Sequence, residues 1–489
     1  MTLGEVFQGV CEIKEELRGL KVTGVTSDSR EVRECSLFVA VEGRSFDGHD
    51  FAGEMLKKGA CAVVTQRELG LEREIRVENS REIYSHLLSA FYGRPTQKIK
   101  LGAVTGTNGK TTVVNLCGQI TRLLGYQTGI IGTLGADTGR GLVYSHEGPP
   151  TNPEPKRLYE LFAEMADIGT EYCFMEASSQ ALAQYRFSAE RFTAAAFTNL
   201  TRDHLDYHGT MEDYFLAKRL LFDMGGAAVV NVDDEYGVRI AEYCREKGIP
   251  LTTMSVRGTA DYYTETVKLF PDRAEFILTD SAAKKSFPVR FAMTGLYNVS
   301  NAVQAAVMCV KMGFELSDIL LALEKISGVG GRLETLYSGE FAVIRDYAHT
   351  EDGLEQLLST LKPLAKGRLI TLFGAAGERD AGKRPAMGAA AAKHSDYLIV
   401  TTDSPRHEDP QKTVDEVAAG IPVGVPWEGY TDRKKAVTAA LDMARSGDIV
   451  ALCGKGHEDY QAIGDEYIHF DEKEIVDEWT RGNGNVQYK

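Results

Sequence analysis

The chain has 489 residues, more than one hydrophobic core usually supports, so we expect two to three domains. Its net charge of -15, without any basic run, argues against a nucleic-acid partner. No apolar run approaches the roughly 18 residues of a membrane helix, and charged residues interrupt the N-terminus where a secretion signal would lie. The eight cysteines are scattered without metal-binding spacing, which predicts buried thiols, no structural zinc and a cytoplasmic protein.

The first segment mixes short apolar strands with a helix. We expect strands at Leu37–Val41 and Ala62–Thr65, and a helix at Phe51–Lys58. A turn-forming stretch at Arg94–Thr96 is typical of a linker. These patterns predict a first domain over residues 1–97.

A glycine-rich turn follows at Gly106-Thr107-Asn108-Gly109-Lys110-Thr111-Thr112, between an apolar strand at 99–104 and a helix at 111–124. Backbone N–H groups in such a turn bind nucleotide phosphates, and the helix N-terminus favours the same negative charge. Lys110 would add a point charge and Thr111 a hydroxyl for Mg²⁺. Only two residues separate the glycines, where the general pattern has four, so this is a shortened variant. The turn predicts an enzyme that uses ATP.

Strands and helices alternate through the rest of a middle domain, over residues 98–331. The alternation predicts a mostly parallel sheet with helices on both faces. Between about 261 and 290 the apolar residues recur every second position, which predicts an antiparallel excursion. The other expected elements are strands at 128–133, 172–176, 194–199 and 227–233, and helices at 211–223, 299–312 and 317–326.

Two charged residues of this domain stand in apolar surroundings. Glu176 ends an apolar strand, where a carboxylate is placed to hold a nucleotide's Mg²⁺, although many strand-end glutamates are ordinary surface residues. Lys218 has apolar neighbours on both sides, and such a lysine commonly extends its ammonium group to solvent.

The six residues that follow a strand, 203–208, include two aspartates and two histidines: Asp203, His204, Asp206 and His208. So dense a cluster favours a metal or phosphate site over a core. A polar loop that caps helices is one alternative. Another is a hydrolytic metal centre, in which His204 and His208 would share a helix face. Gly209 weakens a continuous helix there, and hydrolysis would leave the phosphate turn unexplained.

A second doubly wound pattern covers residues 332–489, with strands expected at 341–346, 368–373, 397–402 and 449–453. Polar residues follow each strand, at the edge where parallel sheets bind ligands. These polar stretches are Asp346–Thr350, the turn around Arg379, Asp403-Ser404-Pro405-Arg406 and Gly454–Glu458. Catalysis between two such domains would take place in a cleft.

In their order along the whole chain, these motifs resemble the Mur ligase family, ATP-dependent enzymes that form amide bonds in peptidoglycan precursors. The resemblance implies an α/β fold of three domains, with a central P-loop domain and a C-terminal Rossmann-like domain. It also implies small-molecule substrates and a monomer. The motifs that carry it are 105–112, Glu176–Ser179 with Gln184 and Arg186, 199–208, Asn298 with Asn301, 331–334, 346–350 and 454–460.

Roles follow from the resemblance position by position. The catalytic residues would be Lys110, Glu176, His204 and Lys218, the last as a carbamylated lysine. Mg²⁺ would be held by Thr111, Glu176, His204 and Lys218. ATP would be bound by residues 106–112 with Asn298, Asn301, Arg332, Asp346 and His349. The UDP-MurNAc-dipeptide would be bound by Ser27, Ser29, Arg30, His49, Thr151, Asn152, Ser178, Gln184 and Arg186. The amino acid would be bound by Arg379, Asp403, Ser404, Arg406, Gly454 and Glu458.

The implied reaction transfers a phosphoryl group from ATP to a glutamyl carboxylate, and an amine then attacks the acyl phosphate. Asp403-Ser404-Pro405-Arg406 resembles the Asp-Asn-Pro-Arg motif of family members that add meso-diaminopimelate. An arginine suits that substrate's distal carboxylate and repels the ammonium group of lysine. Ser404 departs from the motif, so L-lysine or another diamine is the alternative. Gln180 and Asn152 also depart from the family pattern, on the expected peptide-substrate surface, which leaves a non-catalytic nucleotide-binding protein as a third possibility.

Overall fold

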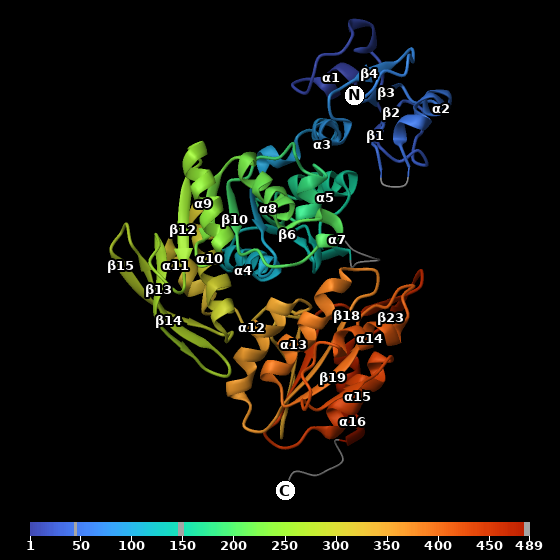
Figure 1. Cartoon of the computed structure of the whole chain (residues 1–489). Coiled ribbons are helices and arrows are strands. Elements are labelled where there is room, and N and C mark those ends of the chain that lie inside the picture. Colours follow the sequence, from blue (N-terminus) through green and yellow to red (C-terminus); the bar gives the residue numbers. More distant parts are fainter. Residues whose placement is uncertain (44–45, 145–150, 484–489) are drawn as a thin grey trace.

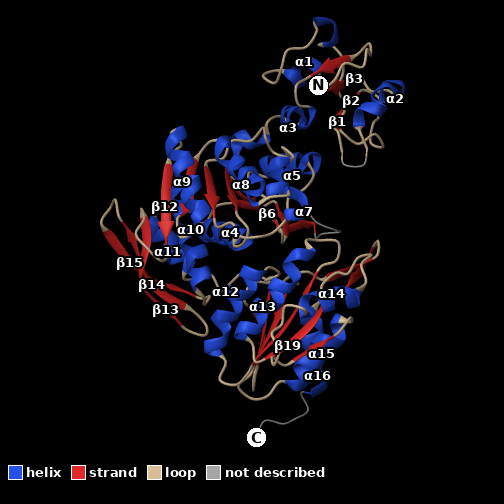
Figure 2. Cartoon of the chain, in the orientation of Figure 1, coloured by secondary structure: helices blue, strands red, loops and turns tan. Residues whose placement is uncertain are grey.

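The computed structural model describes residues 1–43, 46–144 and 151–483, and these form three lobes in chain order (Figure 1). The N-terminal lobe stands apart at one end of the molecule, and the middle and C-terminal lobes face each other across a boundary. Each lobe has its own sheet, with helices on the faces of the two larger sheets (Figure 2). The predicted three-domain α/β fold is confirmed.

The N-terminal lobe is a four-stranded parallel sheet in the order β1-β2-β3-β4. Its Leu87 and Leu88 belong to the same buried cluster as Leu158 and Phe162 of the middle lobe, so apolar packing joins the two lobes. The elements are α1 (Leu3–Phe7), η1 (Glu15–Leu17), β1 (Gly24–Thr26), β2 (Ser36–Val39), η2 (Gly48–Phe51), α2 (Ala52–Lys57), β3 (Ala62–Thr65), β4 (Glu74–Arg76), α3 (Ser80–Phe91) and η3 (Pro95–Lys98).

The middle lobe has an eleven-stranded sheet in the order β15-β14-β13-β12-β11-β10-β5-β9-β6-β7-β8. The strands from β12 to β6 run parallel, and β13, β14 and β15 form the predicted antiparallel excursion. The strands are β5 (Lys100–Thr105), β6 (Thr128–Gly132), β7 (Gly135–Asp137), β8 (Leu142–Tyr144), β9 (Tyr172–Glu176), β10 (Ala194–Phe197), β11 (Ala227–Asn231), β12 (Leu251–Ser255), β13 (Tyr262–Leu269), β14 (Ala274–Asp280) and β15 (Lys285–Phe291).

The helices of this lobe are α4 (Lys110–Leu123), α5 (Pro155–Asp167), α6 (Ser179–Ala183), α7 (Leu205–His208), α8 (Met211–Arg219), η4 (Leu220–Met224), α9 (Glu235–Lys247), α10 (Leu296–Lys311) and α11 (Leu316–Leu323). The helix expected over 211–223 therefore changes form after Arg219. Its last turn tightens into the 3₁₀ helix η4, a common helix ending, and Gly225 with positive φ then turns the chain. The helix expected at 51–58 is observed as α2, and only Phe51 belongs to the preceding 3₁₀ helix η2.

The C-terminal lobe has a six-stranded sheet in the order β16-β17-β21-β18-β19-β20, in which only β16 is antiparallel to its neighbour. Apolar clusters cover both of its faces. The strands are β16 (Glu334–Ser338), β17 (Ala342–Asp346), β18 (Leu369–Ala375), β19 (Tyr397–Thr402), β20 (Trp427–Gly429) and β21 (Ile449–Cys453), with a separate hairpin of β22 (Tyr460–Ile463) and β23 (Glu466–His469). The helices are α12 (Glu351–Leu361), η5 (Lys362–Leu364), η6 (Ala381–Lys383), α13 (Arg384–His394), α14 (Pro410–Ala418), α15 (Arg433–Met443) and α16 (Glu472–Asn483).

All eight cysteines are free thiols; six are buried, while Cys11 and Cys35 are half-buried. Within the described residues, no helix combines the length and the apolar character that crossing a membrane requires.

Candidate functional site

The glycine-rich turn joins β5 to α4, and its two glycines are required by close contacts. Gly106 has φ +146° and Gly109 φ +87°, both in the region that favours glycine. A Cβ on Gly106 would lie 1.8 Å from the Thr198 hydroxyl, and one on Gly109 would lie 2.4 Å from Asn301 Oδ1. The turn is therefore packed against the strand-end loop after β10 and against α10.

Two lysines converge on one carbonyl of this turn. Lys110 Nζ donates to the Gly106 and Thr107 oxygens at 2.9 and 2.8 Å, and Lys218 Nζ donates to the Gly106 oxygen at 2.8 Å. Lys218 is 1 % exposed, so it does not extend to solvent as a typical lysine would. Burial, and the neighbouring charge of Lys110, hold the pKa of Lys218 well below its usual value. A neutral amine is the form that reacts with CO₂.

Glu176 is fully buried at the end of β9 and is not an ordinary surface residue. Its Oε1 accepts the Thr133 backbone N–H at 2.7 Å, and its Oε2 accepts the Thr133 hydroxyl at 3.2 Å. These bonds orient the carboxylate in the wall of the cavity beside Lys110 and Thr111.

The two histidines of the polar cluster, His204 and His208, lie in different surroundings. His204 has a left-handed backbone (φ +53°) and lines the phosphate cavity. Burial, with Lys218 and Lys110 nearby, lowers the pKa of His204 to about 4, so its ring is neutral and able to ligate a metal. His208 instead stacks on Tyr214 and contacts the Ser179 hydroxyl at 2.9 Å. Within the described residues, no three His, Cys, Asp or Glu side chains are grouped so that they could hold a metal ion.

The cavity lies between the middle and C-terminal lobes and has a volume of about 180 Å³. Arg332, in the connection between these lobes, donates to the Thr111 hydroxyl at 3.0 Å and stacks over Tyr347. Asp346 ends β17, and burial raises its pKa. The expected nucleotide residues that line the cavity are Thr107, Asn108, Gly109, Lys110, Thr111, Thr112, Asn298, Asn301, Arg332, Asp346 and His349.

The donors around this cavity fit a nucleotide with Mg²⁺. Backbone N–H groups of the turn and the N-terminus of α4 suit phosphates, whereas a hydroxyl and a carboxylate suit a hard cation. Thr111 and Glu176 supply these oxygen donors from separate segments of the chain, and the imidazole of His204 lines the same cavity.

Four of the nine residues expected at the UDP-MurNAc-dipeptide form one hydrogen-bonded group: Asn152, Ser178, Gln184 and Arg186. Arg186 donates to Gln184 Oε1 through Nε and Nη2 at 3.0 and 2.8 Å, and to the Asn152 carbonyl at 2.7 Å. Asn152 is fully buried, and its amide joins the Glu176 carbonyl to the Ser178 N–H. Asn152 therefore lies beneath the expected substrate surface, where it fixes the strand end that carries Glu176. Thr151 lines the phosphate cavity.

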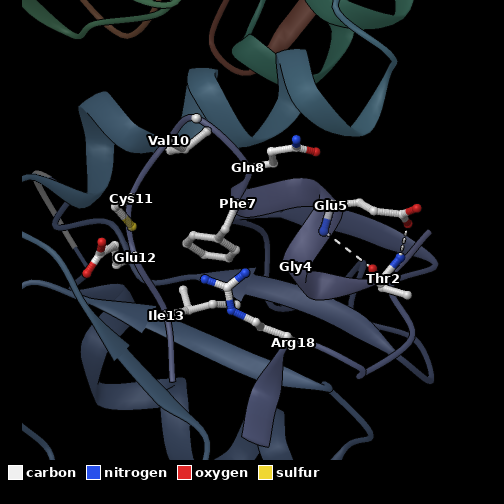
Figure 3. Close-up of a pocket in the computed structure, with 11 residues that line it drawn as sticks. Thr2, Gly4, Glu5, Phe7, Gln8, Val10, Cys11, Glu12, Ile13 and Arg18 are labelled. Carbon is white, nitrogen blue, oxygen red and sulfur yellow. Dashed lines mark hydrogen bonds between the residues drawn. The ribbon is translucent and has the colours of Figure 1, made fainter. Parts of the chain in front are cut away.

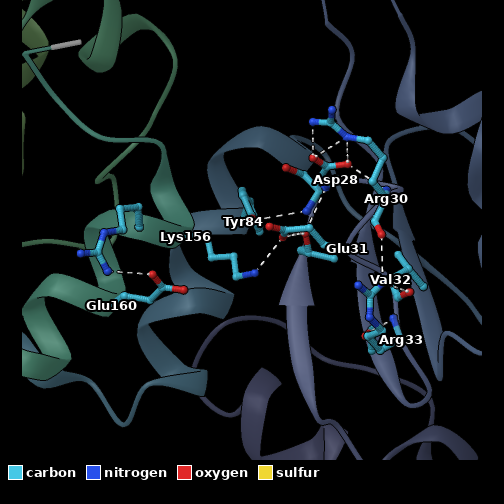
Figure 4. Close-up of polar contacts among 12 residues, drawn as sticks. Asp28, Arg30, Glu31, Val32, Arg33, Tyr84, Lys156 and Glu160 are labelled. Carbon is cyan, nitrogen blue, oxygen red and sulfur yellow. Dashed lines mark hydrogen bonds and ion pairs between the residues drawn. The ribbon is translucent and has the colours of Figure 1, made fainter. Parts of the chain in front are cut away.

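Four residues expected at the UDP-MurNAc-dipeptide, Ser27, Ser29, Arg30 and His49, lie in the N-terminal lobe, and Figure 4 shows the surroundings of Arg30. Arg30 is exposed and pairs with Asp28 through Nε and Nη2 at 3.0 and 2.7 Å. Next to them, Glu31 pairs with Lys156 of the middle lobe at 2.7 Å. His49 is buried; its Nδ1 contacts Asp47 at 2.6 Å and its Nε2 accepts the Gln66 N–H at 3.0 Å, so both ring nitrogens serve the fold.

Ser27 and Ser29 belong to the same loop as Arg30. The Ser27 N–H donates to the Tyr84 hydroxyl at 3.3 Å, and the Ser29 carbonyl accepts Lys58 Nζ at 2.7 Å. A larger hollow of about 680 Å³ lies elsewhere in this lobe, beside α1, and its lining in the described chain includes Phe7, Cys11 and Arg18 but none of the expected site residues (Figure 3).

Three of the residues expected at the amino acid, Asp403, Ser404 and Glu458, surround Lys455, whose role the sequence does not indicate. Lys455 has a fully buried side chain, and its Nζ contacts Glu458 at 2.7 Å, Asp403 at 3.3 Å and Ser404 Oγ at 3.5 Å. Burial disfavours the Asp403 carboxylate, but Lys455 and Arg433 hold its pKa below the usual value. Ser404 Oγ also accepts the Ala462 N–H at 3.2 Å.

Arg406 and Arg379 differ in their surroundings. Arg406 has φ +55°, and its backbone pairs with the β22–β23 hairpin through bonds of 3.0 and 2.8 Å. Arg379 is exposed in the turn after β18. Gly454, with φ +109°, directly follows β21 and lies beside Asp403. Lys455 lies inside the stretch singled out from the sequence, but only its distance to Asp403, 52 positions earlier, reveals its role.

The chain is similar to known proteins along most of its length. Residues 104–309 match the Mur ligase middle domain, residues 331–456 the Mur ligase glutamate ligase domain, and residues 21–92 the Mur ligase family catalytic domain. A relative from Clostridium tetani, a UDP-N-acetylmuramoyl-L-alanyl-D-glutamate--2,6-diaminopimelate ligase, is 38% identical over 94% of this chain and 95% of its own. A protein of the same name from Gloeobacter violaceus is 40% identical over 97% of each chain.

Solved structures show the same similarity. One of a UDP-N-acetylmuramoyl-L-alanyl-D-glutamate--2,6-diaminopimelate ligase superposes with a TM-score of 0.71 at 31% identity, over 99% of this chain and 100% of its own. The MurF ligase of Thermotoga maritima, in complex with ADP, shares the fold alone, with a TM-score of 0.60 at 17% identity over 91% of this chain and 96% of its own.

Proposed function

The chain belongs to the Mur ligase family, and from this membership we propose that it is an ATP-dependent ligase that joins meso-diaminopimelate to UDP-N-acetylmuramoyl-L-alanyl-D-glutamate. The observation that carries the proposal is the cavity between the two larger lobes, which gathers Lys110, Glu176, His204, Arg332 and Asp346 from distant segments. The names of the full-length relatives supply the substrates.

The phosphate turn and Lys110 would bind and orient the outer phosphates of ATP, opposite the glutamyl carboxylate of the second substrate. One carboxylate oxygen attacks the γ-phosphorus and ADP leaves, which gives an acyl phosphate. The incoming amine then attacks the acyl carbon, phosphate leaves and an amide forms. Positioning and charge neutralisation supply most of the acceleration in such transfers. Mg²⁺, held by Thr111, Glu176 and His204, would neutralise phosphate charge, and a carbamylated Lys218 would supply one more carboxylate.

Each lobe would bind a different substrate. Residues 1–97 would hold the uridine end through the Ser27–Arg30 loop, residues 98–331 the nucleotide, and residues 332–489 the amino acid. Arg406 and Arg379 would hold the distal carboxylate of meso-diaminopimelate, since a guanidinium binds a carboxylate in a paired geometry and repels an ammonium group. The net charge of -15 and the small-molecule substrates favour a cytoplasmic monomer that binds no nucleic acid.

Release of ADP tests the proposal. The purified protein is incubated with ATP, Mg²⁺ and UDP-N-acetylmuramoyl-L-alanyl-D-glutamate, and with meso-diaminopimelate or L-lysine in separate reactions. We expect ADP release that requires both the nucleotide sugar and meso-diaminopimelate. Turnover with lysine equal to or above that with meso-diaminopimelate would overturn the assigned amino acid, and ATP-independent hydrolysis would overturn the ligase.

A further inference from the structure

Two short charged segments meet across the boundary between the middle and C-terminal lobes. Arg202 and Asp203 follow β10, whereas Asp380 and Lys383 follow β18. Asp203 Oδ1 lies 3.2 Å from Lys383 Nζ, and Arg202 Nε lies 3.6 Å from Asp380 Oδ2. In each of these two ion pairs, one lobe supplies the positive charge and the other lobe the negative charge.

The Asp203–Lys383 pair is buried, with side chains 8 % and 11 % exposed. Asp203 Oδ1 also accepts the backbone N–H of His204 at 2.9 Å, and its Oδ2 lies 3.8 Å from His349 Nε2 of the C-terminal lobe. A buried carboxylate that loses its partner charge is strongly destabilised. Lys383 therefore stabilises the placement of Asp203 and of the loop that carries His204.

The C-terminal side of this contact is shaped to receive Arg202. Asp380 caps η6 by accepting the Gly382 N–H at 2.9 Å. A Cβ on Gly382 would lie 2.6 Å from Arg202 Nη2, so a larger residue would displace the guanidinium. The absence of a side chain at position 382 lets the two segments approach closely.

The contact joins two parts of the proposed active site. Arg379, an expected ligand of the amino acid, is in the same turn as Asp380 and Lys383. His204, in the wall of the phosphate cavity, directly follows Asp203. Movement of the turn away from the loop would therefore separate the amino-acid site from the phosphate site.

We propose that Lys383 is a positioning residue: through its ion pair with Asp203 it holds the C-terminal lobe in the arrangement where the incoming amine reaches the acyl phosphate. This inference rests on the proposed function. Other contacts cross the same boundary, including Asn108 to Asp352 at 2.8 Å and Arg332 to Thr111 at 3.0 Å. They remain when Lys383 is changed, so its loss loosens the closed arrangement without unfolding a lobe.

The test compares Lys383→Gln with Lys383→Arg, which keeps the charge. Lys393→Gln is the matched control, because Lys393 pairs with Glu355 at 2.7 Å within the C-terminal lobe. We expect Lys383→Gln to lower kcat/KM for the amino acid by about 100-fold, the scale of a misplacement of about 1 Å. KM for ATP should rise by less, and Lys383→Arg should recover most of the loss. All variants should keep the wild-type circular-dichroism spectrum, and only Lys383→Gln should melt below wild type, because Asp203 loses its partner charge.

Small-angle X-ray scattering gives a readout independent of ligase activity. With Mg²⁺ and the ATP analogue AMPPNP, Lys383→Gln should show a larger radius of gyration than wild type, Lys383→Arg and Lys393→Gln. An unchanged radius with lost activity would assign Lys383 to substrate contact and overturn the positioning role. A larger radius of gyration with wild-type kinetics would overturn the inference that the arrangement of the lobes sets the position of the incoming amine. A wild-type protein without ligase activity would refute the proposed function, while the scattering comparison would still decide whether Lys383 holds the lobes together.

The neighbouring pair provides a second variant set. Arg202→Asp and Asp380→Arg alone should each reduce kcat/KM for the amino acid a few-fold, since this pair is half-exposed. The double variant restores opposite charges and should recover part of the activity, while the cap that Asp380 gives to η6 stays lost. A double variant with a lower kcat/KM than either single variant would contradict the pairing of Arg202 with Asp380.

Discussion

Glu408 holds the turn that carries Arg379, and its replacement by glutamine removes the charge while nearly keeping the shape. Its Oε2 accepts Arg384 Nη2 at 2.7 Å and the Glu378 backbone N–H at 3.0 Å. Arg384 is 1 % exposed, and Glu416 is its second carboxylate partner at 2.6 Å. We expect Glu408→Gln to destabilise the C-terminal lobe and to weaken amino-acid binding together.

The size of the effect follows from the acidity of Glu408. The hydrogen bond from Arg384 lowers the pKa of Glu408 to about 2 from a usual 4.5, against a smaller opposing effect of burial. A tenfold change in acidity corresponds to about 1.4 kcal/mol, so the folded lobe favours the carboxylate by about 3 kcal/mol. Because Arg384 keeps Glu416, we expect the free energy of unfolding to fall by about 2 to 3 kcal/mol at pH 7.

The pH dependence has a definite sign. Since the pKa of Glu408 is lower in the folded lobe, its stabilisation is complete above the usual carboxyl pKa of 4.5 and is lost as the pH falls toward about 2. The difference between wild type and Glu408→Gln should therefore shrink by about 1.4 kcal/mol between pH 7 and pH 3.5.

Tryptophan fluorescence during urea unfolding measures this effect selectively, because the chain's two tryptophans, Trp427 and Trp479, both lie in the C-terminal lobe. Glu416→Gln is the control and should cost about 1 kcal/mol, since Glu416 is 33 % exposed. A loss below about 0.5 kcal/mol for Glu408→Gln, or one that is the same at pH 7 and pH 3.5, would refute the reasoning.

Three further substitutions test the site. Gly106→Ala should reduce ADP release by at least about 100-fold, because the new Cβ would lie 1.8 Å from the Thr198 hydroxyl. Gly125→Ala is the control and should keep the activity, because Gly125 also has a positive φ but lies in open space. Lys218→Met should lose activity to a similar extent, and the wild type should lose activity in CO₂-depleted buffer and regain it with bicarbonate; no response to CO₂ would count against a carbamate. Ser404→Asn should raise the preference for meso-diaminopimelate over lysine about tenfold, as one added hydrogen bond allows, and an unchanged ratio of kcat/KM values would show that position 404 does not select the substrate.

The sequence predicted those parts of the fold that depend on local pattern. The strands at 172–176, 397–402 and 449–453 are buried apolar runs and were predicted at their observed bounds. The phosphate turn was predicted as well, because glycine at positive φ beside a lysine and a threonine leaves a local mark. The 3₁₀ turns at 220–224 and 48–51 were not predicted, since tertiary packing and the following glycines determine where a helix tightens.

The sequence indicated those residues of the candidate site whose type and local surroundings suggest a role. The sequence indicated Glu176 and Lys218, but their burial depends on the packing of β9 and α8 in the lobe. Lys455, Lys383 and Thr133 were not assigned, because each acts on a partner far away in the chain: Asp403, Asp203 and Glu176. Asn152 was placed on the substrate surface, although its amide is buried against the backbone at Glu176 and Ser178. Contacts of this kind leave no periodic pattern for a sequence to show.

Selectivity for the incoming amino acid also depends on contacts between distant parts of the chain. Ser404 is 6 % exposed, and its hydroxyl accepts the Ala462 N–H, so it helps to anchor the β22–β23 hairpin. That hairpin in turn fixes the left-handed backbone of Arg406 through two hydrogen bonds. The guanidinium proposed to recognise the distal carboxylate is therefore positioned by residues more than 50 positions downstream. A serine in place of asparagine keeps this support, because its hydroxyl supplies the acceptor that the Ala462 N–H requires, and discrimination then depends on Arg406 and Arg379.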